Sequence, residues 1–173
     1  MRNLVTNTLA LLVIGGLCGL ALTQTNQLTR EPVEANRVRQ AQALLSELLG
    51  QQAPTDLNWQ NGVANPCGPW QFVRGAANGY SGHIHYLALL EKDSIRLRVT
   101  RHQETPGIAD FINHQVDPYL PNLDDTSIAD WGDLDNITGA TITHKALRGM
   151  AAQAQTLVNH QQERDNCEQS NES

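Results

Sequence analysis

An uncharged N-terminal segment constrains this chain of 173 residues more than any other feature. Residues 4–22 include no charged side chain, and their clearly polar members, Thr6, Asn7 and Thr8, all lie near the start of the segment. A helix needs roughly 20 apolar residues to cross the hydrocarbon core of a bilayer, so the segment is just long enough. We therefore predict a transmembrane anchor at residues 1–25.

A cleaved signal peptide is the alternative interpretation of the same segment. Arg2 would form its charged end, and cleavage would follow Ala21, two positions after the small residue Gly19. We favour the retained anchor over the signal peptide. A lipoprotein signal fits less well, because Leu17 precedes Cys18 where such signals have a small residue. The few flanking positive charges do not decide the orientation of the span.

Residues 29–50 predict a helix, which would continue out of the membrane as a stalk. Pro32 suits the first turn of such a helix, and Gly50 suits its end. Apolar side chains recur along it at three- and four-residue spacing, at Ala41, Leu44, Leu45, Leu48 and Leu49. The stalk would occupy residues 26–50.

The strongest strand signal lies at residues 94–101. Apolar residues alternate there with polar ones, Arg96 and Arg98 among them, which predicts one buried face and one solvent-exposed face. Weaker strand candidates are residues 70–74 and 83–90, and a short turn would join the second of these to residues 94–101 as a hairpin. The pattern favours an antiparallel sheet.

The remaining segments complete a small domain. Residues 51–69, rich in Gln, Asn, Pro and Gly, predict a loop, and residues 118–133 predict a mostly irregular acidic stretch. Apolar spacing indicates a final amphipathic helix at about residues 143–160. The polar tail, residues 161–173, is expected to be disordered. The predicted fold is α+β: a membrane helix followed by an antiparallel hairpin or sheet packed against helices, with the domain at residues 51–160.

Charge and ligand patterns argue against two classes of function. The formal net charge of −6 disfavours nucleic-acid binding, which needs a basic face to neutralise phosphates. His83 and His85 share one face of a strand, but no matching carboxylate or cysteine cluster accompanies them, so we predict no metal site. Asp124 and Asp125 lack the spacing of a known calcium loop and are interpreted as part of a solvated acidic loop.

Two cysteines lie beyond the predicted anchor and leave two possibilities open. Cys67 and Cys167 would form a disulfide if the domain faces an oxidising compartment. They would otherwise be two unpaired thiols. The sequence favours neither interpretation.

Residues 135–143 carry the most informative motif, Asp-Asn-Ile-Thr-Gly-Ala-Thr-Ile-Thr. Small residues and hydroxyls stand there just before a predicted helix, whose N-terminal N–H groups and dipole favour a phosphate. Gly139 and Ala140 would let a ligand approach the backbone closely. On local sequence alone, the favoured interpretation is that Thr141 or Thr143 caps the helix.

The wider sequence adds a resemblance to a known family. The motif matches the Asp-x-x-Ser/Thr-Gly-Ala-Thr signature at which a dedicated flavin transferase links FMN to threonine. Two further blocks precede it in the family's order, Gly-Tyr-Ser-Gly at residues 79–82 and His-Gln-Glu-Thr-Pro-Gly at residues 102–107. Together with the N-terminal span, these blocks resemble the G subunit of Rnf-type ion-translocating electron-transport complexes. The C subunit of sodium-translocating NADH:quinone reductase is a more distant relative.

The resemblance implies a cofactor and the residues that hold it. FMN would be attached covalently to Thr141 through its phosphate. The residues of the signature would shape the turn around the phosphate: Asp135, Thr138, Gly139 and Ala140. A loop would bring four further residues against the flavin ring: Glu104, Thr105, Pro106 and Gly107.

The implied function is electron transfer within a membrane complex. No catalytic acid, base or nucleophile is expected from the protein, since the cofactor would carry the redox chemistry. The resemblance places the domain on the periplasmic side of a bacterial inner membrane, in contact with other membrane subunits. Two alternatives remain open: a stand-alone flavinylated domain that donates electrons to another extracytoplasmic reductase, and a non-redox membrane-anchored assembly protein without flavin.

Overall fold

The computed structural model describes residues 2–167 and divides the chain into two compact units, Met1–Glu47 and Leu48–Ser173. The N-terminal unit is formed by helix α1 (Arg2–Leu49). A helix start near Thr29, with Pro32 in the first turn, was predicted, but α1 continues through Pro32 without interruption. The helix tolerates this proline although its ring removes one backbone donor. The predicted domain boundaries at residues 25 and 50 remain predictions.

One stretch of α1 beginning at Leu11 is, within the part of the chain that the structure describes, long and apolar enough to cross a membrane. None of its apolar window is buried inside the protein. Leu12, Ile14 and Leu20, for example, are all more than half exposed. A signal sequence would meet the same test, so the structure is compatible with both interpretations of the segment.

The second unit is built on a six-stranded antiparallel sheet whose strands are ordered as they occur along the chain. Its long central strands are β3 (Gln71–Asn78), β4 (His83–Glu91) and β5 (Ser94–Arg101). Short strands extend both edges: β1 (Trp59–Gln60), β2 (Val63–Ala64) and β6 (Thr126–Ser127). The predicted α+β class with an antiparallel sheet is therefore confirmed.

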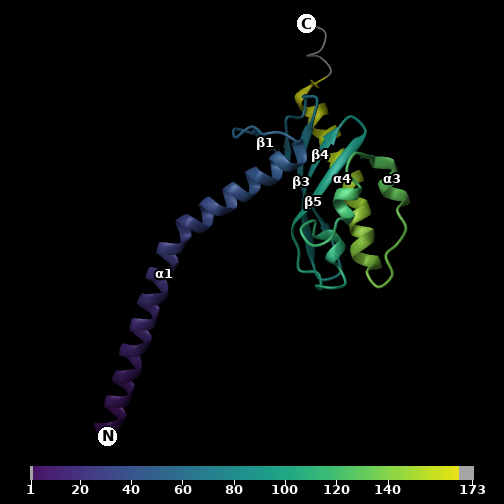
Figure 1. The fold of residues 1–173 in the computed structure, drawn as a ribbon. Helices are drawn as coiled ribbons and strands as arrows, with labels where there is room; N and C mark the ends of the chain where they lie inside the picture. The colour runs from purple at the N-terminus through teal and green to yellow at the C-terminus, as the bar shows by residue number, and fades with distance from the viewer. Residues whose placement is uncertain (1, 168–173) are drawn as a thin grey trace. The chain divides into compact units, whose positions relative to one another are not determined.

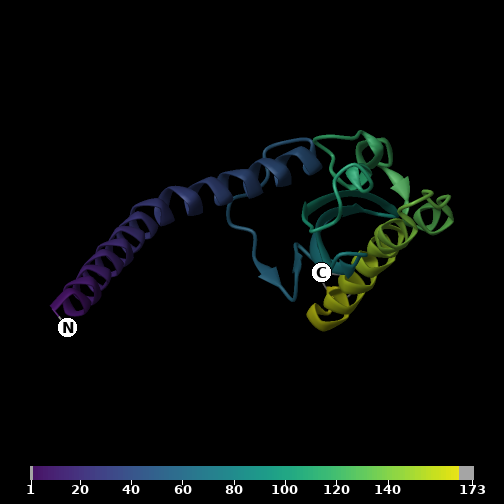
Figure 2. The ribbon, with the colours of Figure 1, turned by 90° about the horizontal axis from the view of Figure 1, so that it is seen from below.

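The long C-terminal helix α4 (Thr141–Asp165) packs on one face of the sheet, mainly on β3 and β4 (Figures 1 and 2). Its buried face includes Leu147, Met150 and Ala154, which join the same core as Tyr86 and Leu97 of the sheet. Helix α3 (Ile128–Asp133) packs beside α4 and places the buried Trp131 in this core. The core thus fixes α4 relative to the strands.

Strand β5 departs from the predicted alternation. Ile95 and Leu97 are buried as expected, but Arg98, predicted on the exposed face, is only 4% exposed. Its guanidinium donates two hydrogen bonds to the Asp124 carboxylate, at 2.6 and 2.7 Å. Such a paired geometry compensates the burial of the charge. The prediction of a fully solvated acidic loop is wrong for Asp124, while the exposed Asp125 pairs with Arg96 at 2.7 Å.

Two segments predicted to be irregular contain regular structure. Residues 51–69 hold strands β1 and β2, and residues 118–133 hold α2 (Tyr119–Asn122), β6 and α3. These elements are short, and partners distant in sequence stabilise them, so local patterns do not reveal them. Ser127 caps α3 by accepting a hydrogen bond from the Asp130 N–H at 3.2 Å.

The C-terminal end of the domain also differs from the sequence-based expectation. Helix α4 runs to Asp165, five residues beyond the predicted end at residue 160. Gln161, expected in a disordered tail, is 3% exposed and accepts a hydrogen bond from Asn61 at 2.9 Å. Cys67 and Cys167 form a disulfide across a separation of 100 residues, which decides between the two possibilities left open above. The rest of the predicted tail, residues 168–173, lies outside the described residues.

Candidate functional site

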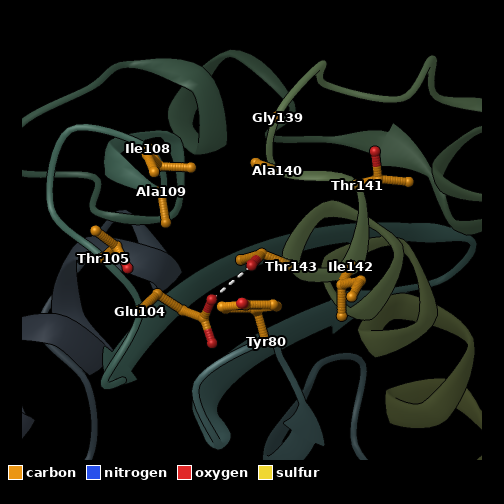
Figure 3. A pocket seen from close by; sticks show the side chains of 10 residues that line it. All are labelled: Tyr80, Glu104, Thr105, Ile108, Ala109, Gly139, Ala140, Thr141, Ile142 and Thr143. Atoms are coloured by element: carbon orange, nitrogen blue, oxygen red, sulfur yellow. Dashed lines mark hydrogen bonds between the residues drawn. The ribbon is translucent and has the colours of Figure 1, made fainter.

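A cavity of about 410 Å³ opens where three segments of the second unit meet (Figure 3). The segments are the turn between β3 and β4, the loop after β5 and the start of α4. Its volume falls within the range of roughly 300–1,000 Å³ that is typical of small-molecule sites. The lining residues are Tyr80, Glu104, Thr105, Ile108, Ala109, Gly139, Ala140, Thr141, Ile142 and Thr143.

The Glu104 carboxylate connects the three segments. One carboxylate oxygen accepts a hydrogen bond from the Ser81 N–H at 2.9 Å, and the other accepts one from the Thr143 hydroxyl at 2.5 Å. Glu104 and Thr143 are 5% and 3% exposed. Because a buried charge requires compensating hydrogen bonds, this cluster holds the three segments in one arrangement.

The turn at residues 79–82 is fitted closely around this carboxylate. The Gly79 N–H donates a hydrogen bond to the Gly82 carbonyl at 2.8 Å and closes the turn. A Cβ atom on Gly79 would overlap a Glu104 oxygen and would lie 2.6 Å from a methyl carbon of Ile84. Both approaches are closer than Cβ atoms adopt, so the buried Glu104 and Ile84 would have to shift to admit a side chain.

Helix α4 begins at Thr141 inside the cavity. Its N-cap residue is Ala140, whose side chain cannot cap the helix, and the His144 N–H donates the first helical hydrogen bond to the Ala140 carbonyl at 2.9 Å. The local prediction of a threonine cap is therefore wrong: Thr143 donates to Glu104 instead, and the exposed Thr141 hydroxyl makes no hydrogen bond within the described chain. Gly139 has a φ of +84°, which allows the sharp approach to the helix.

The wall of the cavity includes three large apolar side chains that are exposed. Tyr80 is 73% exposed, Ile108 55% and Ile142 54%. Figure 3 shows Ile108 and Ile142 on different sides of the cavity, with Tyr80 beside Glu104 and Thr143. An apolar wall beside a helix N-terminus suits a ligand with one flat apolar part and one anionic part.

The structure brings together five of the nine residues that the resemblance assigned to the cofactor: Glu104, Thr105, Gly139, Ala140 and Thr141. Four others lie outside the cavity lining: Asp135, Thr138, Pro106 and Gly107. All four are exposed. Gly107, with a φ of +82°, has a turn role, because its N–H donates to the Asp110 carboxylate at 2.8 Å.

Sequence reasoning missed five lining residues: Tyr80, Ile108, Ala109, Ile142 and Thr143. Tyr80 lies inside the Gly-Tyr-Ser-Gly block, and Ile108 and Ala109 directly follow the Pro-Gly turn. The positions of Tyr80, Ile108 and Ala109 within or beside these motifs could therefore have indicated them as site residues from the sequence. Ile142 and Thr143 belong to the first turn of α4, and only the orientation of that turn shows that both contact the cavity.

A buried histidine lies close behind the first turn of α4. His144 is fully buried, and its Nε2 atom is 2.7 Å from the Tyr119 hydroxyl. Its ring also packs against Phe111, with ring centroids 5.7 Å apart, while its Nδ1 atom has no hydrogen-bond partner among the described residues. Burial lowers the pKa of His144 below its usual value, and the nearby positive charge of Arg148 lowers it further.

The described residues contain no group of three or more metal-binding side chains. His83 is exposed and packs edge-on against His85, at a centroid distance of 6.5 Å. His85 in turn is 2.9 Å from the Arg101 guanidinium, an arrangement that suits a solvated strand better than a metal site.

The cavity coincides with a known domain family. Residues 79–156 match the FMN-binding domain family, and this range contains all ten residues that line the cavity. The match extends from the turn that contains Tyr80 through most of α4. The resemblance predicted from the sequence is confirmed.

Curated relatives agree with the domain match, and those named here are G subunits of ion-translocating oxidoreductase complexes. The chain is 27% identical to the G subunit of Pasteurella multocida, in an alignment that covers 83% of this chain and 88% of that protein. It is 37% identical to the G subunit of Vibrio atlanticus over 49% of this chain and 46% of the relative. For the Escherichia coli protein the identity is 39%, over 42% and 41% of the two chains. The chain thus aligns with less than half the length of the Vibrio and Escherichia proteins.

We predict that Gly79→Ala destabilises the domain by about 1–3 kcal/mol, because the added Cβ would overlap the Glu104 carboxylate and Ile84. The matched control is Gly149→Ala, in the interior of α4, where an added Cβ meets nothing within 4 Å. This control should be neutral or stabilising by up to about 1 kcal/mol. Urea unfolding of both full-length variants in detergent measures the difference, and equal stabilities would contradict the steric argument.

We predict that His144 makes the domain less stable in mild acid. Its folded-state pKa lies below the ordinary value of 6.5, so its contribution is complete above pH 6.5 and declines as the pH falls from 6.5 toward the lowered pKa. Unfolding free energies measured between pH 7.5 and pH 5.5 should therefore fall less steeply for His144→Gln than for the wild type. The exposed His83→Gln variant should keep the wild-type slope. Parallel slopes for all three proteins would exclude this contribution.

Proposed function

We propose that this chain is a membrane-anchored flavoprotein subunit of an ion-translocating electron-transport complex, with FMN attached covalently to Thr141. The observation that carries the proposal is the position of the Thr141 hydroxyl. It lies at the first residue of α4, in the cavity, and makes no hydrogen bond within the described residues. The segment around it matches the FMN-binding domain family.

The start of α4 suits a phosphate ester at this hydroxyl. The first N–H groups of a helix have no intrahelical acceptors, and the helix dipole adds a partial positive charge there. Gly139 has no side chain, and an added Cβ at that position would meet nothing within 4 Å. The backbone before Thr141 therefore leaves open space in which a phosphate could approach the helix end.

The rest of the cavity suits the flavin ring. Ile108, Ala109 and Ile142 present apolar surface, and Tyr80 adds an aromatic face. The Glu104 carboxylate is already engaged by Ser81 and Thr143, so its role is to hold the walls in place. FMN bound there would accept and release electrons, while the protein sets its position and surroundings.

The partners proposed for this chain follow from its relatives. The named relatives are subunits of ion-translocating oxidoreductase complexes, so we assign other membrane subunits as electron donor and acceptor. A flavin transferase would form the ester bond to Thr141. The apolar stretch of α1 would anchor the chain beside these subunits.

The disulfide supports a periplasmic location for the domain. Cys67 and Cys167 are joined in the structure, and disulfides persist in the bacterial periplasm but are rare in the cytosol. The domain would therefore receive its flavin and exchange electrons on the outer side of the cytoplasmic membrane. Covalent attachment would retain the cofactor there.

The attachment is tested on the full-length protein produced in membranes together with a flavin transferase. The wild type should give a fluorescent band in a denaturing gel and an FMN-sized increase in intact mass. Thr141→Ala should lose both completely, because Thr143, the next hydroxyl in the first turn of α4, is buried and bonded to Glu104. The control Thr156→Ala removes an exposed hydroxyl from the same helix, bonded only to the Ala152 carbonyl, and should keep full labelling.

Either of two outcomes would overturn the attachment proposal. If Thr141→Ala remains labelled, another residue carries the flavin. If the wild type is unlabelled while a known flavinylated protein is labelled in the same cells, the chain is not a covalent flavoprotein.

The location is tested by thiol labelling in a Cys18→Ser background, which leaves Cys67 and Cys167 as the two remaining cysteines. Intact cells are lysed in a maleimide polymer that adds mass to each free thiol. We expect no adduct before reduction and two adducts after it. A control chain without residues 1–25, which would stay in the reducing cytosol, should give two adducts at once. Two adducts on the unreduced full-length chain would place the domain in the cytosol.

A further inference from the structure

Tyr80 is unusual among the large apolar side chains of the second unit. It is 73% exposed, more than Val116, Ile108 or Ile142, which are also among the exposed ones there. An aromatic ring in water leaves a large apolar surface uncovered, which favours a partner that covers it. No hydrogen bond of the Tyr80 hydroxyl occurs within the described residues, so no hydrogen bond of its own fixes the position of the ring.

The backbone on both sides of Tyr80 is fixed. The Gly79 N–H bonds to the Gly82 carbonyl, and the Ser81 N–H bonds to the buried Glu104 carboxylate. Gly79 is also enclosed by Glu104 and Ile84. A mobile surface loop would not need such anchoring, whereas a residue that must present its ring at one place would. The turn therefore holds Tyr80 at the cavity before any ligand binds.

The location of the ring points to one kind of ligand. Tyr80 is the sole aromatic residue among the ten that line the cavity. Figure 3 shows it beside the Glu104–Thr143 hydrogen bond, with Ile142 on its other side and Gly139 and Ala140 across the cavity. The aliphatic side chains of Ile108, Ala109 and Ile142 cannot donate hydrogen bonds, so these walls would recognise a planar aromatic ligand by apolar contact, and Tyr80 would recognise it by stacking.

We propose that Tyr80 stacks on the isoalloxazine ring of the bound flavin and orients it in the cavity, an inference that rests on the function proposed above. Tyr80 is a positioning residue for the ring, separate from the attachment atom of Thr141. The turn at residues 79–82 then holds Tyr80 in place. Glu104 contributes indirectly, because its carboxylate fixes the Ser81 N–H next to Tyr80. The ring of the flavin is held by one aromatic contact, while its phosphate is held at the start of α4.

The test uses a general property of flavins: a phenol in van der Waals contact quenches flavin fluorescence. Full-length wild type, Tyr80→Leu and Tyr80→Phe are flavinylated in membranes, and intact mass measures the adduct on each. Native fluorescence lifetimes are then compared. Tyr80→Leu should lengthen the lifetime by about twofold or more, because stacking of the two rings is lost. Tyr80→Phe keeps the ring but removes the phenol, so its lifetime should lengthen while the flavin absorption spectrum stays like that of the wild type.

Tyr119→Phe is the matched control. Tyr119 does not line the cavity and bonds to His144, so its loss should leave the lifetime unchanged. Circular dichroism should show that both Tyr80 variants fold, as expected for so exposed a side chain.

The outcomes separate this inference from the proposed function. Equal adduct on all variants with an unchanged lifetime in Tyr80→Leu would overturn the role of Tyr80 and leave the covalent flavin intact. If no variant carries an adduct, the lifetimes are measured with added FMN. Quenching that depends on Tyr80 would then support the stacking role without attachment. Absence of both adduct and FMN binding would overturn both proposals.

Discussion

The buried carboxylate of Glu104 is the interaction on which the cavity depends. It joins the turn after β3, the loop after β5 and the first turn of α4, three segments that are separated by more than twenty residues each along the chain. Without its two hydrogen bonds, the N-terminus of α4 and the turn that carries Tyr80 would have no direct polar connection at this point. The carboxylate costs free energy to bury, and the Ser81 N–H and the Thr143 hydroxyl offset this cost. The same burial favours this one arrangement, because the loss of either donor would leave one oxygen of the buried carboxylate without a hydrogen bond.

This arrangement explains how one helix serves two purposes. The buried face of α4, with Leu147, Met150 and Ala154, fixes the helix on the sheet through the hydrophobic core. Its first residue, Thr141, remains exposed at the cavity. Because the core determines where the helix axis lies, the position of the Thr141 hydroxyl relative to Tyr80 and Ile108 is set largely by residues that do not line the cavity. At the opposite end of α4, the disulfide between Cys67 and Cys167 and the Gln161 hydrogen bonds tie the helix to the β2 region. Both ends are thus held, and a cofactor attached at Thr141 would have a rigid support.

Charge is compensated differently on the two sides of the sheet. On β5, Arg98 is buried with Asp124, and Arg96 pairs with Asp125, so the acidic loop is part of the structure rather than a free surface. Behind the cavity, His144 is buried with no carboxylate bonded to it among the described residues, and burial and then the charge of Arg148 lower its pKa. The two ion pairs allow β5 to carry charged arginine side chains. The lowered pKa of His144 makes the packing behind the cavity less stable in acid.

The sequence by itself determined the elements with strong local patterns and the motif with specified positions. The apolar N-terminal segment follows from its length and lack of charge, and strand β5 and helix α4 follow from periodicity. The Thr141 motif follows from five specified positions. The short strands β1, β2 and β6 could not be predicted, because two-residue strands are stabilised by partners rather than by their own propensity. The burial of Arg98 could not be predicted either. Its alternation with apolar neighbours indicates a solvent-exposed position, and the partner that compensates its burial, Asp124, lies 26 residues away in the sequence. Only the tertiary structure showed that Tyr80, Ile142 and Thr143 meet Glu104 around one cavity. It also showed that Thr141 does not cap α4. Both depend on the orientation of the first turn of α4, which is set by long-range packing and by one buried carboxylate.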